Sequence, residues 1–88
     1  MENIKEYDIV VLTQDIQATH KQTHKPILLR RGQVGTVLMD FEQKAFLIDF
    51  ADQDGVTYAM ETVDQEKLIP LLYQPCEVLA LRPGKIIF

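Results

Sequence analysis

The fold is decided by residues 45–61, which read AFLIDFADQDGVTYAME. Apolar and mixed positions alternate in the first part of this stretch, with Phe46, Ile48 and Phe50 on one side, as the two faces of a β-strand require. The DQDG sequence is typical of a hairpin turn, because Gly55 can adopt the positive φ angle that such a turn needs. The following VTYAME is expected to return as the next strand. A β-hairpin at the centre of the chain is therefore predicted.

Three further strands are predicted on either side of this hairpin. Residues 7–12 are rich in β-branched side chains and too few for a stable helix, so they are expected to form the first strand. The second strand follows a tight turn and a β-bulge, both indicated by Gly32 and Gly35. A single 3₁₀ turn at 64–66 leads into a short last strand at 68–71, whose proline is expected at a sheet edge.

The resulting fold class is all-β: a small SH3-like barrel of five short antiparallel strands. The polar stretch 13–26 is expected to be a long loop after the first strand. We assign residues 1–72 to the barrel and residues 73–88 to an apolar C-terminal extension that could add a strand to it. No helical periodicity longer than two turns interrupts this pattern.

Composition narrows the classes of function. A chain of 88 residues with 47% apolar and 25% charged residues is expected to form one globular domain. A net charge of −4 disfavours nucleic acid as a partner. The single cysteine, Cys76, and the absence of a leader-like opening predict a cytoplasmic protein, and the longest apolar runs are too short to cross a bilayer.

Residues with ligand or nucleophile chemistry are present but poorly arranged for it. His20 and His24 are spaced as helical metal ligands, yet they fall in a predicted loop. The sequence from Asp52 to Gly55 lacks most of the carboxylates of a calcium loop and is better explained as a turn. Cys76 has no neighbouring cation to activate it. We therefore predict no enzyme, no catalytic residue, no metal and no cofactor.

The strands carry more apolar side chains than one small barrel can bury. The expected inward set is Ile9, Val11, Val37, Met39, Phe46, Ile48 and Phe50, which leaves Val10, Leu12, Leu38 and Leu47 outside. Three covers for these outer residues remain open: the chain's own extension, a second copy in a homodimer, or another protein.

The predicted partner contacts follow from this excess. They are Leu38 and Leu47 on the barrel and Val78, Leu79, Leu81, Ile86 and Phe88 in the extension. Arg30 and Arg31 are expected to steer an acidic partner toward them.

Three blocks in order, residues 4–12, 31–37 and 50–59, resemble the DUF4926 family of small bacterial proteins of unknown function. The resemblance covers roughly residues 4–71 and implies an SH3-like barrel, without an activity. Some members resemble the small partner in toxin–antitoxin-like gene pairs, which implies a protein-binding role.

Function is therefore expected to be that of a protein-interaction module, accessory or antitoxin-like. One alternative is an RNA- or ribonucleoprotein-binding KOW-like barrel that uses the basic residues Lys21, Lys25, Arg30 and Arg31. Another is a structural homo-oligomer without a ligand. A small enzyme ranks last, because no concave polar site is indicated.

Overall fold

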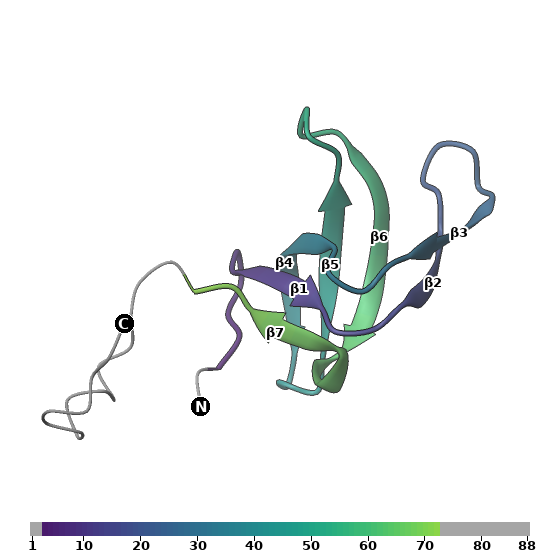
Figure 1. Cartoon of the computed structure of the whole chain (residues 1–88). Helices are drawn as coiled ribbons and strands as arrows, with labels where there is room; N and C mark the ends of the chain where they lie inside the picture. The colour runs from purple at the N-terminus through teal and green to yellow at the C-terminus, as the bar shows by residue number, and fades with distance from the viewer. Residues whose placement is uncertain (1–2, 73–88) are drawn as a thin grey trace, which may run out of the picture.

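The computed structural model describes residues 3–72, which form an all-β domain with one 3₁₀ turn (Figure 1). Within this part of the chain, no helix has the length and apolar character needed to cross a membrane. The elements are β1 (Ile9–Leu12), β2 (Ile16–Thr19), β3 (Pro26–Leu29), β4 (Val34–Phe41), β5 (Ala45–Ala51), β6 (Thr57–Asp64), the 3₁₀ turn η1 (Gln65–Lys67) and β7 (Leu68–Pro70).

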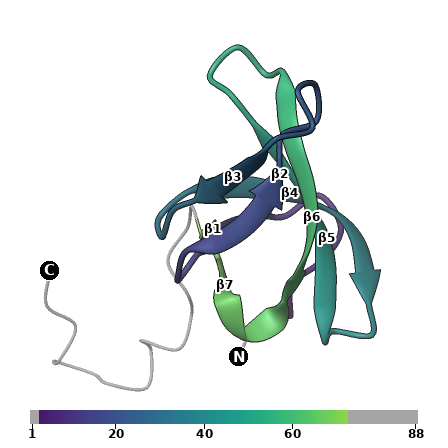
Figure 2. The ribbon, with the colours of Figure 1, turned by 90° about the vertical axis from the view of Figure 1, so that its right-hand side faces the viewer.

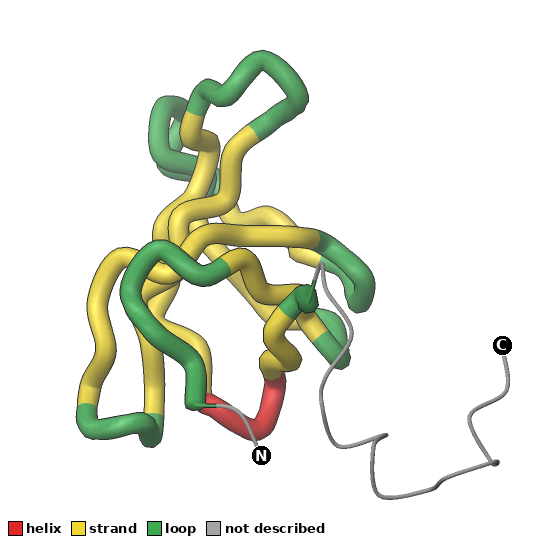
Figure 3. The backbone as a smooth tube through the Cα atoms, turned by 90° about the vertical axis from the view of Figure 1, so that its left-hand side faces the viewer, coloured by secondary structure: helices red, strands yellow, loops and turns green. Residues whose placement is uncertain are grey.

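Five strands form one antiparallel sheet in the order β6-β5-β4-β1-β7. The remaining two, β2 and β3, form a separate hairpin that packs beside β6 (Figures 1 and 2). The sheet curls into a small barrel-like domain (Figures 2 and 3), with β1 and β7 on the opposite side of β5 from the hairpin (Figure 1). The predicted all-β class and the five predicted strands are confirmed as β1, β4, β5, β6 and β7.

The prediction of a long loop at 13–26 is wrong, because β2 lies within it. Its strand pairs with β3 in the register Ile16↔Leu29 and Ala18↔Ile27. Ala18 and Leu29 are buried in the core, and Ile16 and Ile27 pack against it. Alternate apolar residues thus hold the hairpin on the barrel, but β2 is only four residues long and contributes just Ile16 and Ala18 to this pattern.

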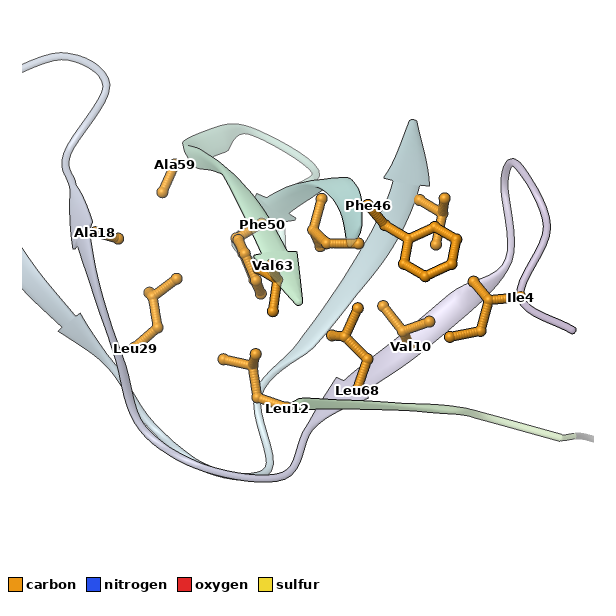
Figure 4. Packing of buried hydrophobic residues seen from close by; sticks show 12 residues of the cluster. Ile4, Val10, Leu12, Ala18, Leu29, Phe46, Phe50, Ala59, Val63 and Leu68 are labelled. Carbon is orange, nitrogen blue, oxygen red and sulfur yellow. The ribbon is translucent and has the colours of Figure 1, made fainter. Parts of the chain in front are cut away.

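The core fills the space between the sheet and the hairpin (Figure 4). Four predicted inward residues are confirmed as buried: Val37, Phe46, Ile48 and Phe50. The first strand has the opposite orientation to the one predicted, since Val10 and Leu12 are buried while Ile9 and Val11 are only half-buried. A run that is apolar at every position gives no signal for its orientation, and the burial of the paired Leu68 beside Leu12 shows which face is inside.

A β-bulge explains the other error in orientation. The β4–β5 register shifts between Val37 and Met39, so that Val37 faces the core and Met39 is 49% exposed. The bulge had been predicted near the two glycines, which have other roles. Gly32 adopts φ +96° in the turn before β4, and a Cβ atom on Gly35 would collide with the side chain of Ile48 on β5.

The predicted turn at the β5–β6 hairpin is confirmed. Gly55 adopts φ +83°, and its amide donates to the Asp52 carbonyl oxygen at 2.9 Å. The Asp52 carboxylate accepts from the amides of Asp54 and Val56 at 2.8 and 3.0 Å. This turn therefore uses the aspartate to satisfy its own backbone.

Several predictions concern residues outside the described range. They are the added strand in 73–88, the reactivity of Cys76 and the contacts at Val78, Leu79, Leu81, Ile86 and Phe88. These stay predictions, as does the domain division at residue 72.

Candidate functional site

The candidate site is the solvent side of β4, β1 and β7, where apolar side chains lie in register. Val11 on the central strand pairs with Val34 on one side and with Ile69 on the other. Directly paired residues in antiparallel strands point to the same face, and the intervening Val10 and Leu12 point into the core. We call the five residues Ile9, Val11, Val34, Ile69 and Leu71 the outer face.

Leu71 belongs to this group because it continues the β1–β7 register. Its amide donates to the Ile9 carbonyl oxygen at 2.9 Å, which places the two residues opposite each other. Leu71 is 40% exposed, Val34 48% and Ile69 53%, whereas Ile9 and Val11 are half-buried beneath them. The outer face is therefore a contiguous apolar surface in contact with water.

A polar row bounds the outer face toward β5 and β6. Ile9 pairs with Thr36, which pairs with Asp49 on β5, and Asp49 accepts a hydrogen bond from the Thr57 hydroxyl at 2.6 Å. This row separates the outer face from the side chain pair Met39 and Leu47 farther along the sheet. The apolar surface is consequently limited to three strands.

The predicted contact residues of the barrel fall on two sides of that row. Leu47 lies beyond it, and Leu38 lies at the bulge, both half-buried. Arg30 and Arg31 occupy the turn that leads into β4 and are exposed. The structure therefore places the two arginines near the Val34 end of the outer face and does not bring Leu38 or Leu47 into it.

The β2–β3 hairpin is attached to β6 by one backbone and one side-chain hydrogen bond. The Lys21 amide donates to the Tyr58 carbonyl oxygen at 2.8 Å. The Glu61 carboxylate on β6 accepts from the Thr19 amide at 2.9 Å. At the other end of the hairpin, the Asp15 carboxylate accepts from the Arg31 amide at 2.8 Å and lies 3.6 Å from the Arg30 guanidinium. These carboxylates have a structural use in fixing the hairpin.

Aromatic and basic residues meet at the tip of the hairpin without forming one basic surface. The His20 ring stacks on Tyr58, with ring centroids 6.4 Å apart, and the Tyr58 hydroxyl accepts from the Gln33 side chain at 2.6 Å. Lys21 and Lys25 lie at this tip, whereas Arg30 and Arg31 lie past the opposite end of β3. The four basic residues proposed for RNA are therefore divided between the two ends of the strand.

The predicted histidine pair, His20 and His24, lies in the turn between β2 and β3, where His20 bonds the backbone of the turn. The Nδ1 atom of His20 accepts from the amides of Gln22 and Thr23 at 3.2 and 3.3 Å, and His24 adopts φ +61° in the same turn. Among residues 3–72, no group of three or more histidine, cysteine, aspartate or glutamate side chains is arranged to hold a metal ion.

A cleft of about 270 Å³ opens where β2 and β6 diverge. It is lined by Asp15, Ile16, Gln17, Glu61, Thr62, Val63, Asp64 and Lys67. Two of its carboxylates, Asp15 and Glu61, are the hairpin attachments described above. Its lining combines these carboxylates with Thr62 and Lys67 and contains no histidine, cysteine or serine.

A family model described as "Domain of unknown function (DUF4926)" matches residues 6–70, which include all seven strands. The chain belongs to the DUF4926 family. Comparisons with curated proteins and with solved structures found no match. Membership in DUF4926 assigns a family and no activity to the chain.

The sequence analysis predicts none of the five residues of the outer face as contacts. Val34, Ile69 and Leu71 were not among the predicted contacts, and Ile9 and Val11 were assigned to the interior. A usable signal was present, since three short strands carry apolar residues on both faces. The pairing of β1 with β4 and β7 was needed to show that these residues are neighbours.

Proposed function

We propose that this DUF4926 chain is a protein-interaction module that binds an apolar segment of another protein on its outer face. The observation that supports this proposal is the row Val34–Val11–Ile69, which lies in register across three neighbouring strands and is open to water at both ends. Such a surface is costly to leave hydrated, at roughly 25 cal/mol for each Å² of apolar area. A partner that buries it gains that free energy.

The charges around the outer face favour an acidic partner. Arg30 and Arg31 lie at its Val34 end and are exposed. The Arg30 guanidinium lies 3.6 Å from the Asp15 carboxylate, which also accepts from the Arg31 amide. Exposed rim charges mainly raise the rate of association and select the partner, whereas the buried apolar contacts supply affinity. The role fits an accessory or antitoxin-like protein that acts by occupying another protein.

The test is capture of a partner by the full chain from an extract of its native cells. Ile69→Asp should abolish retention of a specific protein, because burying an aspartate in an apolar contact is expected to weaken binding by more than tenfold. Leu28→Asp is a matched control, since Leu28 and Ile69 are both 53% exposed strand residues and Leu28 lies on the hairpin. Equal retention by the two variants would contradict the proposal.

A further inference from the structure

The outer face is small compared with a surface that binds a globular protein. Three strands at about 4.8 Å spacing and about four residues of strand length define an area of roughly 200 Å². A standard protein interface contributes about 800 Å² from each partner. The outer face therefore suits a short extended segment with a few apolar side chains better than a second folded surface.

The chain itself carries such a segment immediately after the outer face. From β7 the chain passes through Leu71 and Leu72, both exposed, to the 16 residues 73–88, which lie outside the described range. Nine of these 16 residues are apolar, and four of them are consecutive from Val78 to Leu81. The six residues 72–77 connect Leu71 to Val78 and can span up to about 20 Å. This exceeds the width of three strands, so the connection is long enough for residues 78–81 to reach the outer face.

The free edge of β7 is poorly suited to accept this segment as an added strand. Lys67 and Leu71 exchange hydrogen bonds with β1, so the backbone groups of the alternate residues Leu68 and Pro70 point away from the sheet. The Leu68 amide already donates to the Gln65 carbonyl oxygen, and Pro70 has no amide hydrogen. An added strand would find no free donor between Leu68 and Leu71, which leaves the face as the available surface.

We infer that apolar residues 78–81 of the same chain bind the outer face and compete there with the partner segment. The inference rests on the proposed function, because it assigns a built-in competitor to the same surface. Covalent attachment gives the segment an effective concentration in the millimolar range, so even weak contacts suffice for occupancy. If residues 78–81 occupied the outer face in nine-tenths of the molecules, the apparent Kd of the partner would rise about tenfold.

Methyl NMR on the full chain tests the inference without any partner. We expect cross-relaxation between methyl groups of Leu79 or Leu81 and those of Val34 or Ile69. A mixed sample of labelled and unlabelled protein separates contacts within a chain from contacts between chains. Contacts only between chains would overturn the inference in favour of a second copy. The absence of both kinds would overturn it in favour of a free face.

A second experiment measures the competition directly, with a synthetic peptide of residues 75–83 as the probe. Leu79→Asp should release the face, so the peptide should bind this full-length variant about tenfold more tightly than it binds the unaltered chain. Gln74→Asp adds the same charge before the apolar run and should leave peptide affinity unchanged. Equal affinity for the unaltered chain and Leu79→Asp, or binding to neither, would overturn the inference.

The two proposals fail separately. If the peptide and NMR experiments fail while capture still depends on Ile69, the partner site stands and the internal competitor does not. If the internal contact is found but no protein is captured, only the proposal of a protein partner is contradicted.

Discussion

The β4–β6 meander and the β2–β3 hairpin are both antiparallel units, but they are held in place by different interactions. The meander buries Phe46, Ile48 and Phe50 completely and is joined by two long ladders, each with one register shift. The hairpin buries only Ala18 and Leu29. It is fastened to β6 by the Lys21–Tyr58 backbone hydrogen bond, the Glu61 carboxylate and the His20–Tyr58 stack, and Asp15 closes its open end.

This difference shows where stability resides. Free energy from apolar burial is concentrated in the meander, and the hairpin relies on polar attachments that are individually worth about 1 kcal/mol. We therefore expect the hairpin to open by local unfolding while the meander opens only when the whole domain unfolds. Three substitutions test this comparison, beginning with the largest expected effect.

Phe46→Ala should lower the free energy of unfolding by about 3–5 kcal/mol, because it removes a fully buried aromatic ring and leaves a cavity. A domain of this size has little more stability than that, so most of the variant should be unfolded at 37 °C. Urea denaturation followed by far-UV circular dichroism measures the effect. The control is Phe41→Ala, since Phe41 is 41% exposed, and a similar cost for the two would break the comparison.

Gly35→Ala should cost about 1–3 kcal/mol through overpacking between β4 and β5. The new Cβ would collide with Ile48 and lie 3.1 Å from the Phe50 ring. Ile48→Ala removes the colliding atoms, so the double variant should cost less than the sum of the two single changes. If urea denaturation showed that the two changes in free energy of unfolding are strictly additive, the alanine at position 35 would not collide with Ile48, which would contradict the close packing of β4 on β5.

Glu61→Ala should cost about 0.5–1.5 kcal/mol and act mainly on the hairpin, because the Thr19 amide loses its acceptor. Hydrogen exchange at Thr19 should accelerate while exchange in β5 changes little. Glu61→Gln keeps an acceptor oxygen and should have a smaller effect. Glu66→Ala, at an exposed position of η1, is the control, and equal acceleration by it would remove the distinction between the two regions.

The sequence predicts the meander well because local signals agree there. Two-residue alternation, the glycine at the turn and the short strand lengths all point to the same structure between residues 45 and 61. The hairpin gives no such agreement, since its four-residue strands each contribute only two inward side chains. Its formation depends on the core and on Glu61, which lies more than 40 residues away from Thr19 in sequence.

The existence of an exposed apolar surface could be predicted from the sequence, but the residues that form it could not. An excess of apolar residues indicates that some strand must expose them, and this is confirmed by Val34 and Ile69. Which side of β1 is exposed depends on its pairing with Val34 and Ile69, and these partners are separated from Val11 by long stretches of sequence. The bulge in β4 also changes the orientation of Met39, and no local sequence pattern predicts a bulge at this position.

The position of β1 has a consequence for how the chain folds. This strand comes first in the sequence but is hydrogen-bonded between β4 and β7, so both its partners are synthesised later. Closing loops of this length is entropically unfavourable before the contacts form, which slows folding relative to a helical domain of equal size. During synthesis, residues 9–12 should remain unpaired until β4 has left the ribosome, and the final closure awaits β7. The chain therefore has its longest exposure to chaperones and misassembly at its first strand.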